Sequence, residues 1–68
     1  MLELTTLEDY AVFIDHTSVE LVEQQEDGTC ICLKSGKIIF VLESAVEINA
    51  DIVALSYKDD VNNIRIVK

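Results

Sequence analysis

Sixty-eight residues allow only one domain, and a hydrophobic share of 50% excludes a disordered acidic tail. Thirteen Asp and Glu residues against five Lys and Arg residues give a formal net charge of −8, which disfavours sequence-independent binding to nucleic acid or to anionic membranes. No apolar stretch is long enough to span a membrane, and the start of the chain lacks the basic and apolar regions of a signal peptide. We therefore expect a single small β-rich domain over residues 1–68, located in the cytoplasm and not associated with a membrane.

The first two predicted strands form a hairpin. Residues 2–6 alternate between apolar and polar side chains, as in a half-buried strand, and residues 10–14 form a second run of β-favouring side chains. Between the two runs, the acidic pair Glu8-Asp9 provides a turn. The pattern predicts antiparallel pairing of the two runs.

A polar corner follows at residues 15–18. Its adjacent Asp15 and His16 could be taken for an acid–base pair. Side chains adjacent in sequence rarely aim at one reacting atom, and no candidate nucleophile has a motif around it. We therefore expect a solvated histidine at this corner rather than a catalytic one.

Three further strands are predicted after this corner. The runs at residues 18–25, 29–34 and 37–42 are rich in apolar residues and are separated by two turn signals, Glu26-Asp27-Gly28 and Ser35-Gly36. Asp-Gly between β-rich runs indicates a hairpin, because glycine accepts the positive φ that tight turns need. Two short turns in succession predict a three-stranded antiparallel meander, and together with the first hairpin they give about five strands.

The last two of these strands are apolar on both faces. In the first of them, Cys30 and Cys32 would lie on one face and Ile31 on the other, and residues 38–42 alternate in the same way. In residues 18–25 the apolar residues do not alternate regularly, so either a bulge shifts the register or both faces are partly covered; the two following strands favour the second interpretation. We expect a helix of the chain to cover one face, and a second sheet layer or another molecule to cover the other.

The two cysteines do not predict a disulfide or a metal site. Cys30 and Cys32 are so close in sequence that a bridge between them would strain an extended backbone. Two cysteines and a distant histidine do not complete a structural zinc site. We expect two reduced thiols that fill the core of a cytosolic protein, and no cofactor.

A helix is predicted to begin after Ser44. Ser44 and Glu47 fit a capping box, in which each side chain bonds the main-chain N–H of the other residue. A stripe of apolar residues recurs at helical spacing and comprises Ala45, Ile48, Ile52 and Leu55, widened by Val46 and Val53. We expect one amphipathic helix over residues 45–56 that packs on the sheet, and residues 64–67 could form a last short strand at a sheet edge or a dimer seam.

Short motifs occur in these predicted strands and in the turns between them: Leu4-Thr5-Thr6-Leu7, Val19-Glu20-Leu21-Val22-Glu23, Asp27-Gly28-Thr29, Ser35-Gly36-Lys37 and Val41-Leu42-Glu43-Ser44. In this order they resemble the FlbD-type flagellar protein family, over residues 1–53. The chain departs from the family pattern at Asp9-Tyr10, where Gly-Lys is common, at the additional Gly28, and in the tail from residue 56. The resemblance implies an accessory or regulatory interaction module, and similar patterns occur in small phage and plasmid proteins.

The stretch from residue 19 to residue 44 is also similar to the core of LytTR-type DNA-binding domains. Those domains use basic and polar loop residues to enter successive grooves of DNA. The basic residues available here are few and spread along the chain: Lys34, Lys37, Lys58, Arg65 and Lys68. We therefore do not expect nucleic acid as the partner, and a nucleic-acid-associated regulator or an acidic DNA mimic is the alternative function.

The sequence contains no Gly-rich phosphate loop, no paired nucleophile and base, and no ligand cluster at workable spacing, so we do not expect an enzyme. We expect a non-enzymatic interaction or regulatory module that forms homo-oligomers and docks a partner protein, in a flagellar or phage-related process. The apolar residues on both sheet faces motivate this expectation. The candidate interface comprises Ile39, Phe40, Val41, Ile64 and Ile66.

Overall fold

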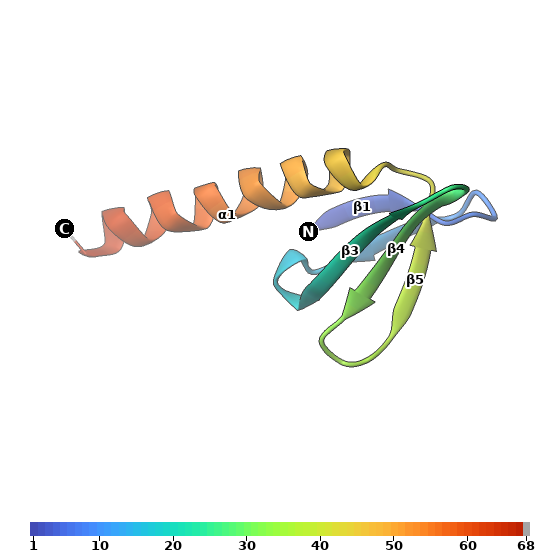
Figure 1. Cartoon of the computed structure of the whole chain (residues 1–68). Helices are drawn as coiled ribbons and strands as arrows, with labels where there is room; N and C mark the ends of the chain where they lie inside the picture. The colour runs from blue at the N-terminus through green and yellow to red at the C-terminus, as the bar shows by residue number, and fades with distance from the viewer. Residues whose placement is uncertain (68) are drawn as a thin grey trace.

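The computed structural model describes residues 1–67 of the chain, with side chains for residues 1–57. Five strands are followed by one long helix (Figure 1). A short 3₁₀ turn, η1, lies at His16–Ser18. The strands and the helix are β1 (Leu2–Thr5), β2 (Ala11–Ile14), β3 (Val19–Gln25), β4 (Gly28–Leu33), β5 (Ile38–Val41) and α1 (Ala45–Val67). The predicted α+β class, with antiparallel strands followed by a helix, is confirmed.

The first two strands pair as a separate two-stranded antiparallel sheet. In the register of this hairpin, Leu2 lies opposite Ile14 and Leu4 lies opposite Val12. These side chains share one face and belong to the core or pack against it. Phe13 points to the other face and is 61% exposed. The hairpin therefore has one apolar inner face, as the alternation in the sequence predicts.

The remaining strands form a three-stranded antiparallel sheet in the order β3-β4-β5, which is the predicted meander. The pairing of β3 with β4 shifts between Val19 and Leu21, so that Glu20 is an extra residue in β3. Because of this bulge, Val19 and Val22 both pack against the core, whereas Leu21 is 51% exposed. The interpretation that both faces of β3 are partly covered is therefore wrong, and a register shift explains its irregular pattern.

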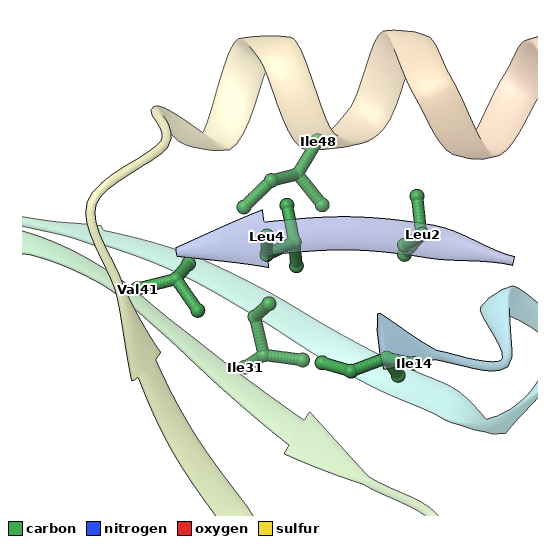
Figure 2. Close-up of a cluster of buried hydrophobic side chains, with 6 residues drawn as sticks. All are labelled: Leu2, Leu4, Ile14, Ile31, Val41 and Ile48. Atoms are coloured by element: carbon green, nitrogen blue, oxygen red, sulfur yellow. The ribbon is translucent and has the colours of Figure 1, made fainter. Parts of the chain in front are cut away.

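The core lies between the three-stranded sheet and a layer formed by the β1–β2 hairpin and α1 (Figure 2). Figure 2 shows its side chains gathered from β1, β2, β4, β5 and the first turns of α1. The buried members are Leu2, Leu4, Ile14, Ile31, Val41 and Ile48. Hairpin and helix thus cover the same, inner face of the sheet. Among the described residues nothing forms a layer over the opposite face.

The helix begins after Ser44 as predicted, but it continues to Val67, well beyond the predicted end near residue 56. The chain has no proline, and no glycine follows Gly36, so no strong stop signal interrupts the helix. The short strand expected at residues 64–67 is wrong, because the backbone there is helical. The second half of α1 extends past the strands and makes the molecule elongated, 46 × 22 × 19 Å (Figure 1).

Only part of the predicted apolar stripe of α1 is buried. Ile48 is inaccessible to solvent, and Ile52 and Leu55 pack against the core. Val46 and Val53, expected to widen the stripe, are 79% and 59% exposed, and the main contacts of the helix are with β3 and β1. No helix among the described residues combines the length and the apolar character needed to cross a membrane.

The turn between β3 and β4 depends on glycine. Glu26 and Asp27 form the connection, and Gly28 begins β4 with φ +154°, a conformation that side chains disfavour. A Cβ at this position would lie 2.6 Å from the main-chain oxygen of Val41 and 3.2 Å from Cδ2 of Leu7. The missing side chain therefore lets Val41 at the end of β5, and Leu7 in the turn of the first hairpin, lie close to the start of β4.

Candidate functional site

Three of the motif segments in the sequence meet at one junction, where the chain leaves β5 for the helix. The carboxylate of Glu43 accepts hydrogen bonds from the main-chain N–H and from the hydroxyl of Thr5, each at 2.9 Å. Thr29 is fully buried and donates its hydroxyl to the main-chain oxygen of Glu43 at 2.6 Å. Because Thr5 belongs to one sheet and Thr29 to the other, this Glu43 junction (Thr5, Thr29 and Glu43) ties the two sheets together.

The start of the helix is fastened beside the Glu43 junction. The main-chain N–H of Glu47 donates to Oγ of Ser44 at 3.1 Å, which confirms this half of the predicted capping box. In place of the reciprocal bond to the main chain, the Glu47 carboxylate accepts from the Ser44 hydroxyl at 3.4 Å. The main-chain N–H of Ala45 donates to Oε1 of Gln24 at 2.8 Å, so β3 also holds the helix start. Two of the N–H groups that a helix start leaves without an intrahelical partner are therefore satisfied by side chains.

Hydrogen bonding keeps Glu43 ionised. Its partial burial would raise the pKa of the carboxyl, but the hydrogen bonds from Thr5 and from its own main-chain N–H outweigh burial, and the pKa lies below its usual value. The carboxylate is engaged by Thr5 through both oxygens. The arrangement at this junction stabilises the fold and offers no poised acid or base.

The corner at Asp15 and His16 also has a structural explanation. Oδ1 of Asp15 accepts hydrogen bonds from the main-chain N–H and the hydroxyl of Thr17 at 3.0 and 2.8 Å, which caps η1 and lowers the pKa of Asp15. Nδ1 of His16 lies 4.0 Å from the same oxygen. The prediction of a solvated histidine is wrong, since the side chain of His16 is only 14% exposed.

The sheet face turned away from the core carries uncovered apolar side chains. The register places them in two rows across β3, β4 and β5. Three are large and about half exposed: Leu21 at 51%, Ile38 at 56% and Phe40 at 47%. We call this the outer face; it comprises Leu21, Cys32 and Ile38 in one row and Glu23, Cys30 and Phe40 in the next. Contiguous exposed apolar surface of this kind marks an interaction site more often than scattered single residues do.

The two turns at the ends of the outer face carry opposite charges. Lys34 and Lys37 flank the β4–β5 turn, and they are the only Lys or Arg residues among the described side chains. Glu26 and Asp27 lie at the other end, in the β3–β4 turn. A pocket of ≈ 500 Å³ adjoins this acidic end and is lined by Leu7, Gln25, Glu26, Asp27, Gly28 and Phe40.

The two cysteines are free thiols on the outer face of β4. Burial raises the pKa of the Cys30 thiol, and the neighbouring Cys32 thiol raises it further. A protonated thiol is a poor nucleophile and a poor metal ligand. Both cysteines therefore act as small apolar side chains; Cys30 is buried, as predicted for a thiol that fills the core, whereas Cys32 is only partly buried.

The structure separates the residues of the predicted interface. Phe40 lies on the outer face, where a partner can reach it. Ile39 packs against the core and Val41 is inaccessible to solvent, so Val41 has no surface to offer a partner. The side chains of Ile64 and Ile66 lie outside the described residues.

The FlbD family model, described as flagellar and swarming motility proteins, matches residues 1–61. The chain belongs to the FlbD family. No curated protein and no solved structure gives a match. The match to FlbD extends beyond residues 1–53, over which the sequence motifs carry the resemblance.

In this FlbD protein, several motif residues form hydrogen bonds that stabilise the fold, and most of the exposed apolar side chains of the outer face lie outside these hydrogen bonds. Sequence reasoning treated Thr5, Thr29 and Glu43 as markers of turns and strands and missed that they meet. The only sequence feature that could have indicated this junction is the polar residue near the end of each apolar run. Leu21 and Ile38 were missed as surface residues, because alternation along a strand does not say which face another layer will cover.

Proposed function

We propose that this FlbD protein is a non-enzymatic interaction module of flagellar or swarming motility that self-associates and docks a partner protein in the cytoplasm. The observation that carries the proposal is the outer face, where Leu21, Ile38 and Phe40 are about half exposed on the three-stranded sheet. A sheet of this kind usually has its apolar face covered. A second molecule can supply that cover.

The distribution of polar groups supports an interaction role over a chemical one. The motif residues with hydrogen-bonding side chains are engaged at the Glu43 junction and at the helix cap. The Asp15 carboxylate is engaged by Thr17. The side chains that remain accessible on the outer face are chiefly apolar. Such side chains stabilise a complex when they are buried away from water, and they have no proton to exchange in a reaction.

The proposal is tested with Phe40→Glu and a matched control, Phe13→Glu. Both residues are exposed phenylalanines on strands, but Phe13 lies on the outside of the first hairpin, away from the outer face. We expect Phe40→Glu to keep the wild-type melting temperature, to lose self-association by light scattering, and to abolish swarming when it replaces the wild-type protein in cells. Phe13→Glu should retain all three properties.

The structure divides the effects of neighbouring substitutions in β5. Ile39→Asp places a charge against the core and is expected to unfold the protein, whereas Phe40→Glu is expected to change association alone. If Phe40→Glu cells swarm normally and the purified variant has the same mass as wild type, the outer face is not the interaction site and the proposal fails.

A further inference from the structure

We infer that the outer face is covered by the outer face of a second copy of the chain, with the strands of the two copies antiparallel. The inference rests on the proposed function, because it names the occupant of the same surface. It goes further in fixing the orientation of the two copies and the charged contacts between them.

Stacking two copies through their outer faces buries the apolar rows of both. Sheets pack face to face about 10 Å apart, with side chains from the two inner faces interdigitating. Turning the second copy end for end sets the row containing Leu21 and Ile38 over the partner's row containing Phe40. Each copy then covers the other's exposed apolar side chains. Glu23 is on edge strand β3, where it can stay in contact with water.

The charges at the two ends select the antiparallel orientation. The register shows that the β4–β5 turn, with Lys34, and the β3–β4 turn, with Asp27, lie at opposite ends of β4 (Figure 1). Five residue steps along β4 separate these ends by about 17 Å. An antiparallel stack therefore brings Lys34 of each copy to Asp27 of the other, twice in the dimer. A parallel stack would set lysine against lysine and acid against acid.

The same charge pattern favours a second copy over other occupants. The chain carries a net charge of −8, so two copies repel each other over most of their surfaces. Both lysines of residues 1–57 flank the turn at one end of the outer face, and a second copy matches both of its ends at once. A purely basic partner would match only the end at Glu26 and Asp27, and a nucleic acid would match only the lysine end.

The inference is tested by single charge reversals in the full-length chain, with the dimer dissociation constant measured by analytical ultracentrifugation. Lys34→Glu and Asp27→Lys each turn two attractive contacts per dimer into repulsive ones, so each variant is expected to dimerise about tenfold more weakly than wild type. Asp27→Lys decides between explanations, because it reduces the net negative charge. General repulsion would make this variant dimerise more tightly, whereas the antiparallel stack makes it dimerise more weakly.

Mixing the two variants gives the sharpest result. In a mixed dimer, Glu at position 34 of one copy meets Lys at position 27 of the other, and the second contact pairs the native Asp27 with the native Lys34. We therefore expect an equimolar mixture to recover the wild-type dissociation constant, and the double variant Lys34→Glu, Asp27→Lys to recover it alone. Asp51→Lys makes the same change of charge on the exposed side of α1 and should not weaken the dimer.

Each outcome separates the inference from the proposed function. Glu26→Lys replaces Asp27→Lys if the latter melts below wild type. One outcome is that Phe40→Glu dissociates the dimer, while the charge reversals and their mixture leave the dissociation constant unchanged. This outcome refutes the antiparallel stack but still supports the interaction module. The second copy is refuted as occupant if the wild-type protein stays monomeric at all concentrations and a different protein or a nucleic acid binds its outer face.

Discussion

Glu43 shows how one residue can help to hold two sheets together. Its carboxylate bonds Thr5 while its main-chain oxygen accepts from buried Thr29, so a single residue joins the first hairpin, the meander and the start of the helix. Removing one partner from a part-buried network leaves the other groups without a hydrogen bond, which costs more than the bond itself contributed.

We expect Glu43→Gln to lower the free energy of unfolding by about 1–3 kcal/mol, because a neutral amide accepts more weakly and adds donors that face the donors of Thr5. The folded-state pKa of Glu43 is lowered, so its stabilisation is fully present above the unfolded pKa and is lost as pH falls through the folded pKa. Urea denaturation from pH 7 down to pH 3 should therefore show a smaller acid loss in Glu43→Gln than in wild type. The exposed Glu3→Gln serves as control, and an equal acid loss in Glu43→Gln and wild type would contradict the assignment.

The two glycines allow a second comparison at the residue scale. Both have positive φ, Gly28 at +154° and Gly36 at +96°, but only Gly28 has neighbours within reach of an added Cβ. We expect Gly36→Ala to cost about 1 kcal/mol of unfolding free energy from backbone strain. Gly28→Ala should cost clearly more, since the main-chain oxygen of Val41 must also move. Thermal melts of both variants decide this, and equal losses would show that the contact with Val41 relaxes freely.

At the scale of elements, only a narrow stripe of side chains on α1 packs against the core. Ile48 is inaccessible to solvent, so Ile48→Ala is expected to lower the free energy of unfolding by about 2–5 kcal/mol. Val53 is 59% exposed, and Val53→Ala should be neutral or slightly stabilising, because alanine favours the helix more than valine does. Urea denaturation of both variants measures the difference. A large loss in Val53→Ala would mean that the wider stripe is covered.

Local patterns were enough to predict most elements. Alternation gave the strands, Gly28 and Gly36 marked the turns, and Ser44 with Glu47 gave the helix start. The features that sequence reasoning missed depend on distant residues. The bulge at Glu20 is visible only once β4 sets the register, and the Glu43 junction joins positions far apart in sequence.

At the scale of the whole molecule, the chain has covered one face of its main sheet and left the other bare. The hairpin and the helix are both used on the inner face, which leaves no described element for the outer one. Sequence reasoning predicted apolar residues on both faces of the sheet. It could not say which face the hairpin and the helix would cover, because hydrophobic burial is non-directional. Of the predicted interface residues on β5, the structure leaves Phe40 as the one on the outer face.

The Glu43 junction also has a consequence for the order of folding. Thr5 and Glu43 are 38 positions apart, and Leu4 and Ile48 lie in the same core, so the first hairpin meets its partners only when the last strand and the helix start are in place. A two-stranded hairpin alone is marginally stable in water. We therefore expect the N-terminal hairpin to become stable during synthesis only after residues 43–48 have left the ribosome, and we expect closure of this long loop to be the slow step of folding.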